Sequence, residues 1–156
     1  MAAQNAVVEP ERKPPYGAYA AIMATFAGGL AGAGALARAL DRDPHEQSAL
    51  DLVALALATF KAARTIARDP VASFVRDPLV EEDAPGGLQQ ALGELVTCTR
   101  CTGTWVAAGL GATQIVAPRF GSLLTWTLGA AGLNDFLQAG FAALASKSNQ
   151  LERSET

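Results

Sequence analysis

Charged residues are missing from several long stretches of the chain, and this pattern predicts helices that cross a membrane. No charged side chain lies between Lys13 and Arg38, or between Arg100 and Arg119. The hydrocarbon core of a bilayer, about 30 Å thick, requires roughly 20 apolar residues in a helix. Both stretches are close to this length, and residues 120–146 exceed it with Asp135 as their one charge.

A fourth apolar segment is shorter. It lies between Asp51 and Lys61, and its apolar face continues to Arg68. We therefore expect an all-α polytopic membrane protein, a bundle of about four transmembrane helices near residues 17–40, 49–67, 96–117 and 120–147. Three spans remain the alternative if residues 49–67 do not cross, and a cleaved signal peptide is the alternative for the first segment.

The segments between these helices are polar. Ser48 stands where an N-cap is expected for the second helix. The middle loop, residues 68–95, ends in leucines at helical spacing, which predicts a short amphipathic helix at the membrane surface before the third span. We expect the tails, residues 1–16 and 148–156, to be solvated and loosely ordered.

Basic residues indicate the orientation, because Lys and Arg collect on the cytoplasmic side of membrane proteins. With four spans, most basic residues near the helix ends share one side: Arg12, Lys13, Arg68, Arg76, Arg100, Lys147 and Arg153. Arg42 and Arg119 lie on the other side. Both termini and the middle loop are therefore expected in the cytoplasm, with the lipid bilayer as a partner.

Composition agrees with this class. The chain is 50% hydrophobic and 17% charged, with a net charge of -3. Soluble domains average about 25% charged residues. The negative net charge also provides no electrostatic footprint for nucleic acid, which is not expected as a partner.

Small residues in the first helix form a smooth face. Gly28 and Gly32 lie four apart within a glycine- and alanine-rich run. Such spacing lets helices approach closely in membranes. Packing against the protein's own helices is favoured, and a dimerisation surface is the alternative.

Charges inside the predicted spans form a second candidate feature. Lys61 and Arg64 lie three apart, on one helical face. Counted from the outer helix ends at about 1.5 Å per residue, Arg64 and Asp135 both reach a depth of about 22 Å. We expect an ion pair between them, with Asn134 and Gln138 completing a polar cluster. A structural clamp is favoured, and an ion or proton path is the alternative.

Cys98 and Cys101 are the only two cysteines of the chain. A helix N-terminus and the neighbouring Arg100 would favour a thiolate. The pair could pack at the interface, act in redox chemistry, or bind zinc or iron. A zinc site normally has four protein ligands, and His45 is expected on the opposite side of the membrane, so a metal would have to be shared across a dimer. A stable disulfide is not expected in the reducing cytoplasm. Trp105 lies on the same face as Cys101, and we expect it at the membrane interface.

The run from Leu92 to Trp105 carries a family resemblance. It reads Leu-Gly-Glu-Leu-Val-Thr-Cys-Thr-Arg-Cys-Thr-Gly-Thr-Trp. This resembles the Cys-x-x-Cys-x-Gly-x-Trp signature of an uncharacterised family of small bacterial membrane proteins, catalogued as domain of unknown function 1360. The helix from Asp51 to Asp69 and the Asp135-Phe136-Leu137 run are also similar. The resemblance implies a bacterial inner (plasma) membrane location and no known activity.

No Ser-His-Asp set, phosphate-binding loop, HExxH motif or carboxylate pair is visible, so a non-catalytic role is favoured over an enzyme. The expected function is that of a structural or accessory subunit of a membrane assembly, with a protein partner or a second copy and without a cofactor. The alternative is a thiol-redox or metal-binding membrane protein that acts through Cys98 and Cys101 at the cytoplasmic face.

Overall fold

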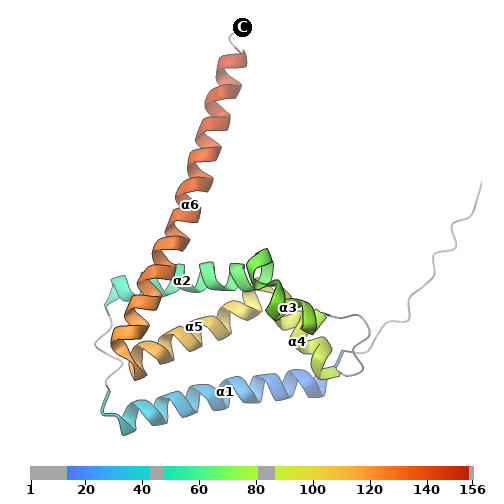
Figure 1. Ribbon diagram of the computed structural model, residues 1–156, viewed down its shortest axis with the longest axis vertical. Helices are drawn as coiled ribbons and strands as arrows, with labels where there is room; N and C mark the ends of the chain where they lie inside the picture. The colour runs from blue at the N-terminus through green and yellow to red at the C-terminus, as the bar shows by residue number, and fades with distance from the viewer. Residues whose placement is uncertain (1–13, 43–47, 81–86, 155–156) are drawn as a thin grey trace, which may run out of the picture.

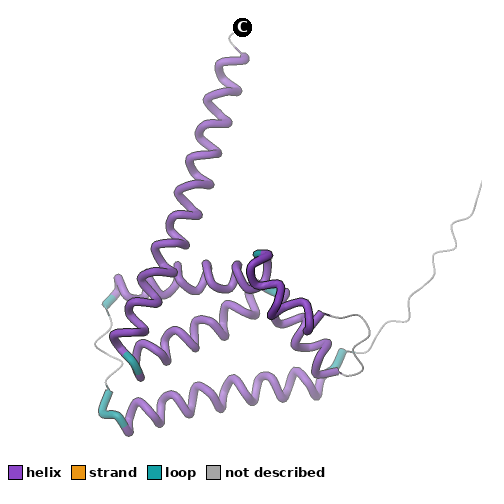
Figure 2. The backbone as a smooth tube through the Cα atoms, viewed as in Figure 1, coloured by secondary structure: helices purple, strands orange, loops and turns teal. Residues whose placement is uncertain are grey.

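The computed structural model describes residues 14–42, 48–80 and 87–154, and every regular element in these ranges is a helix (Figure 2). Four helices are long: α1 (Tyr16–Ala39), α2 (Ala49–Arg68), α5 (Thr99–Val116) and α6 (Pro118–Ser154). A 3-10 turn η2 (Pro70–Ala72) and two short helices, α3 (Ser73–Val80) and α4 (Gly87–Thr97), lie between α2 and α5. The all-helical class predicted from the sequence is confirmed.

The long helices coincide with the four predicted apolar segments, and α4 matches the predicted amphipathic helix. The middle loop also contains η2 and α3, which the sequence does not predict. One expectation is wrong, because α6 continues through Ser154 and a loosely ordered tail is expected from residue 148. The predicted tail with Arg12 and Lys13, the turn that contains His45, and the acidic residues 81–83 lie outside the described residues.

Ser48 caps α2, as the sequence predicts. Its hydroxyl accepts a hydrogen bond from the Asp51 backbone N–H at 3.2 Å, and its own N–H donates to Asp51 Oδ2 at 2.9 Å. This reciprocal arrangement is a capping box, which satisfies two backbone donors at the helix start. The start of α2 is thereby fixed by local sequence.

The helices do not form an aligned bundle of four (Figure 1). α2 packs against α5 and α6, while α1 lies against α4 and α5. The first part of α6 lies across α2 and α5, and its C-terminal part projects away from the other helices. α6 therefore departs from the expected bundle of about four helices, because it crosses α2 and α5 instead of lying alongside them.

The packed interior is made of small side chains. Apart from Leu110, the buried hydrophobic residues in the described part of the chain are alanines: Ala37, Ala54, Ala58, Ala63, Ala67, Ala72 and Ala91. Two glycines of α6 bring it against α2. A Cβ on Gly129 would lie 2.9 Å from the Ala54 carbonyl oxygen, and one on Gly132 would lie 2.5 Å from that of Leu57. The close approach of α2 and α6 therefore requires glycine at these positions.

Within the described residues, one helix is long and apolar enough to cross a membrane. It is α1, and 6% of its most apolar window is buried inside the protein. Its position near the N-terminus is also that of a signal sequence.

Candidate functional site: a disulfide beside an apolar cavity, and an interhelical ion pair

The chain bends at Cys98, between α4 and α5. Cys98 is the N-cap of α5, and its sulfur accepts a hydrogen bond from the Cys101 backbone N–H at 3.3 Å. The buried Thr102 hydroxyl donates to the Leu95 carbonyl oxygen at 2.7 Å. Leu95 lies in the last turn of α4, where backbone carbonyls have no helical partner. The bend is thus held by the Cys98 sulfur and the Thr102 hydroxyl, which bond to backbone groups on either side of it.

Cys98 and Cys101 are joined in a disulfide, with their Cα atoms 5.3 Å apart. The expectation that no stable disulfide forms is therefore wrong for this structure. It rested on the reducing power of the cytoplasm, whereas the local geometry brings the two sulfurs together at one helix start. Metal ligation requires free thiolates, so the disulfide form and a metal-bound form exclude each other.

The described residues contain no group of three or more His, Cys, Asp or Glu side chains that could hold a metal ion. His45, which the metal alternative also considered, lies outside the described residues. A metal shared between two copies stays a prediction.

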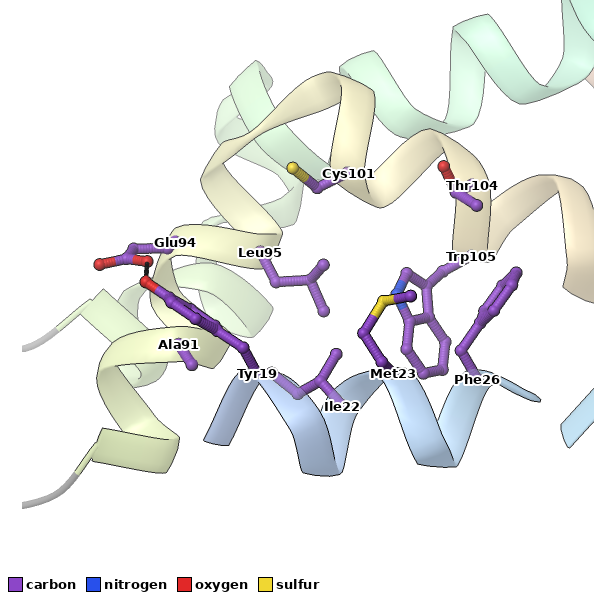
Figure 3. Close-up of a pocket in the computed structure, with 10 residues that line it drawn as sticks. All are labelled: Tyr19, Ile22, Met23, Phe26, Ala91, Glu94, Leu95, Cys101, Thr104 and Trp105. Carbon is purple, nitrogen blue, oxygen red and sulfur yellow. Dashed lines mark hydrogen bonds between the residues drawn. The ribbon is translucent and has the colours of Figure 1, made fainter. Parts of the chain in front are cut away.

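An apolar cavity of about 410 Å³ lies between α1, α4 and α5, with Cys101 among the residues that line it (Figure 3). Cys101, Thr104 and Trp105 line it from α5. Four residues at helical spacing line it from α1: Tyr19, Ile22, Met23 and Phe26. The Phe26 and Trp105 rings meet edge to face, with centroids 5.1 Å apart. Trp105, expected only at an interface, therefore also packs against α1.

One end of this cavity is polar. The Tyr19 hydroxyl donates a hydrogen bond to Glu94 Oε2, across the contact between α1 and α4. Gln90 Nε2 donates to the other carboxylate oxygen of Glu94 at 3.1 Å. Sequence reasoning missed the contribution of α1. The spacing of Tyr19, Ile22 and Phe26 on one helical face is the signal that could have indicated it.

The interhelical ion pair exists, with a different cation from the one expected. Lys61 Nζ lies 2.9 Å from Asp135 Oδ2, joining α2 to α6. The predicted pair between Arg64 and Asp135 is therefore wrong. The Phe60 and Phe136 rings pack beside it, with centroids 4.8 Å apart. Lys61 and Asp135 remain 27% and 34% exposed, respectively.

Most of the predicted polar cluster does come together. Lys61, Arg64, Asp135 and Gln138 line one cavity of about 500 Å³, together with Asp69. Asn134 is exposed and does not line it. The sequence therefore identifies the members of the cluster better than it identifies their pairing.

Gly28 and Gly32 face open space. Nothing in the described residues lies within 4 Å of the position that a Cβ would take at either glycine. The expectation that they pack against the protein's own helices is therefore wrong. Close packing uses Gly129 and Gly132 of α6 instead.

Comparisons with known proteins place this region in a family. A family model described as "Protein of unknown function (DUF1360)" matches residues 80–141, which include α4, α5 and the ion-paired part of α6. The chain is also 33% identical over 104 residues to the "Sporulation protein YjcA" of Bacillus subtilis (strain 168), an alignment that covers 57% of this chain and 88% of that protein. No solved structure matches the chain.

Proposed function

The chain belongs to the DUF1360 family of proteins of unknown function, and we propose that it is an integral membrane protein with a thiol–disulfide centre at Cys98 and Cys101. The observation that carries the proposal is the disulfide at the start of α5, on the wall of an apolar cavity.

The distribution of side-chain sizes supports a membrane location. Soluble proteins bury Leu, Ile, Val and Phe. Here the interior is mostly alanine, while large apolar side chains such as Met23, Leu123 and Phe141 are more than 60% exposed. In a bilayer such side chains face lipid, and small residues let the helices approach. The surface and interior of the described helices fit that environment.

The directions of α1 and α5 support the proposal that these helices are the first and third of four spans. Residue numbers rise together along α1 and the α4–α5 segment, from Tyr19 at Glu94 to Phe26 at Trp105. They also rise together across the α2–α6 contact, from Ala54 at Gly129 to Lys61 at Asp135. First and third spans run parallel in any four-span protein, as α1 and α5 do, whereas α6 crosses α2 (Figure 1). With the basic-residue pattern, this favours a bacterial inner membrane protein with both termini in the cytoplasm.

The redox role rests on the position of the cysteines. In that topology, Cys98 and Cys101 lie at the cytoplasmic end of α5. A disulfide on a reducing side is usually transient and is then catalytic or redox-sensing. The N-terminus of α5 would stabilise a Cys98 thiolate, since the Cys101 N–H already points at that sulfur. The two cysteines are therefore placed to alternate between a disulfide and two free thiols.

Redox titration of the full chain in detergent tests this role. The protein is equilibrated in glutathione buffers of graded potential, quenched with acid and alkylated for mass analysis. Both thiols should disappear together in one transition, and C98S or C101S should abolish the intramolecular disulfide. Thiols that stay free at every potential, or that form only separate mixed disulfides with glutathione, would contradict the proposal.

A second candidate function, an accessory subunit of a membrane assembly, is favoured by the open glycine face of α1. Gly28, Gly29, Gly32 and Gly34 all face open space in the described structure. We expect G32L to reduce co-purification of a protein partner or a second copy while monomer melting stays unchanged. Gly109, on α5, also has nothing within 4 Å, so G109L is a matched control. Equal co-purification of both variants would contradict this role.

A further inference from the structure

We infer that the cavity between α1, α4 and α5 binds the ring of a lipophilic quinone, which exchanges electrons with the Cys98–Cys101 pair. This inference rests on the proposed thiol–disulfide function and deepens it. Three features of the cavity carry it: an apolar and aromatic lining, one polar end, and a cysteine of the redox pair on the wall.

The lining favours an apolar ligand that can pack against aromatic side chains. The cavity holds about 410 Å³, within the range of about 300–1,000 Å³ typical of small-molecule sites. The Phe26 and Trp105 rings form one end, and Ile22, Met23 and Leu95 extend the apolar wall. Because α1 is the most apolar long helix and is almost unburied, a ligand dissolved in the bilayer can approach along it.

The polar end holds one hydrogen-bond donor for a quinone oxygen, the Tyr19 hydroxyl. Tyr19 and Glu94 meet there through a hydrogen bond, so an exchangeable proton lies on the same wall as the apolar surface (Figure 3). In the structure the Tyr19 hydroxyl donates to Glu94, so a quinone oxygen would accept the Tyr19 hydrogen in place of the carboxylate. A ring with carbonyl oxygens and an apolar tail satisfies both ends of the cavity.

The redox step balances with quinone as the oxidant. Two S–H bonds, at Cys98 and Cys101, break and one S–S bond forms. The two electrons and two protons pass to the quinone, whose two carbonyl oxygens become the hydroxyls of a hydroquinone. Cys101 lines the cavity and would face the ring, while Cys98, held by the Cys101 N–H, closes the disulfide behind it.

The test uses the reduced full chain in detergent, mixed under argon with decylubiquinone or with diamide, a water-soluble thiol oxidant. Lost thiols are counted by alkylation and mass, and quinone reduction is followed by absorbance. Met23 lines the cavity and is 66% exposed, so the fold should tolerate M23W, whose larger side chain fills the cavity. A24W is the matched control, since the exposed Ala24 is the next residue and does not line the cavity.

We expect each chain to reduce one quinone and lose both thiols. M23W should slow the quinone reaction by about tenfold or more, equivalent to about 1.4 kcal/mol, while its diamide reaction and both A24W reactions stay unchanged. Three results would overturn the quinone site and leave the proposed function standing. They are oxidation by diamide but not by quinone, a quinone rate that M23W leaves unchanged, and an M23W variant in which both reactions slow equally. Failure of diamide to form the intramolecular disulfide would overturn the proposed function itself.

Discussion

A pair of glycine substitutions in α6 tests how α2 and α6 pack. Gly132 and Gly140 lie in the same helix, and replacing either with alanine removes the conformational freedom of glycine in the unfolded chain. In a helix this change stabilises by about 0.5–1 kcal/mol. The two sites differ in their surroundings, so the difference between the variants isolates the packing contribution.

At Gly132 the added Cβ would lie 2.5 Å from the Leu57 carbonyl oxygen and 3.4 Å from Lys61 Cβ. The oxygen belongs to the backbone of α2, so the two helices must move apart. Overpacking of this kind typically costs about 1–3 kcal/mol. At Gly140 nothing in the described residues lies within 4 Å, and only the helix-forming gain remains.

We therefore expect G132A to be less stable than G140A by about 1–3 kcal/mol. For a chain of this size the difference corresponds to roughly 2–12 °C in melting temperature. Thermal unfolding in one detergent, followed by circular dichroism, measures it. If G132A melts at the same temperature as G140A or above it, the close contact between α2 and α6 does not exist.

Three further predictions follow from named contacts. D135A should destabilise the protein by about 1–3 kcal/mol, because Lys61 loses its partner at a half-buried position, and the K61M/D135A double variant should recover part of the loss; a D135A melting temperature equal to wild type would exclude the clamp. S48A should cost about 0.5–2 kcal/mol in the same melting assay, and S48G only a few tenths; equal values for both would show that the capping box does not contribute. In intact cells, an impermeant maleimide should leave reduced Cys98 and Cys101 unlabelled, and a tag after Thr156 should be protected from external protease; labelling from outside would reverse the topology.

The sequence predicted the helices well because charge spacing and caps are local properties. It did not predict the partner of Asp135. Depth counted from the helix ends treats α2 and α6 as straight, evenly aligned spans, and that count selects Arg64. In the structure, Gly132 lets α6 pack closely against the Leu57 carbonyl oxygen and the Lys61 Cβ of α2. Asp135 lies about one turn further along α6, where its carboxylate pairs with Lys61 Nζ. The pairing is set by a glycine contact that hydropathy does not reveal.

The cavity could not be predicted from the sequence either, because it requires α1 to lie beside α4 and α5, which are distant from it along the chain. The apolar spacing of Tyr19, Ile22 and Phe26 indicates a packed face and does not say what packs on it. The cysteines were recognised as a pair, but their state was argued from the compartment alone. The hydrogen bond from the Cys101 N–H to Cys98 comes from the bend at the start of α5.

The most direct test of the thiol–disulfide centre is the state of the two cysteines inside living cells. Bacteria that express the full chain are quenched in acid with and without a brief diamide pulse, and free and oxidised thiols receive alkylating reagents of different mass. We expect Cys98 and Cys101 to change label together, as a reversible pair that diamide oxidises and that recovers after the pulse. Two cysteines that keep the free-thiol label throughout, or that change independently of each other, would contradict it.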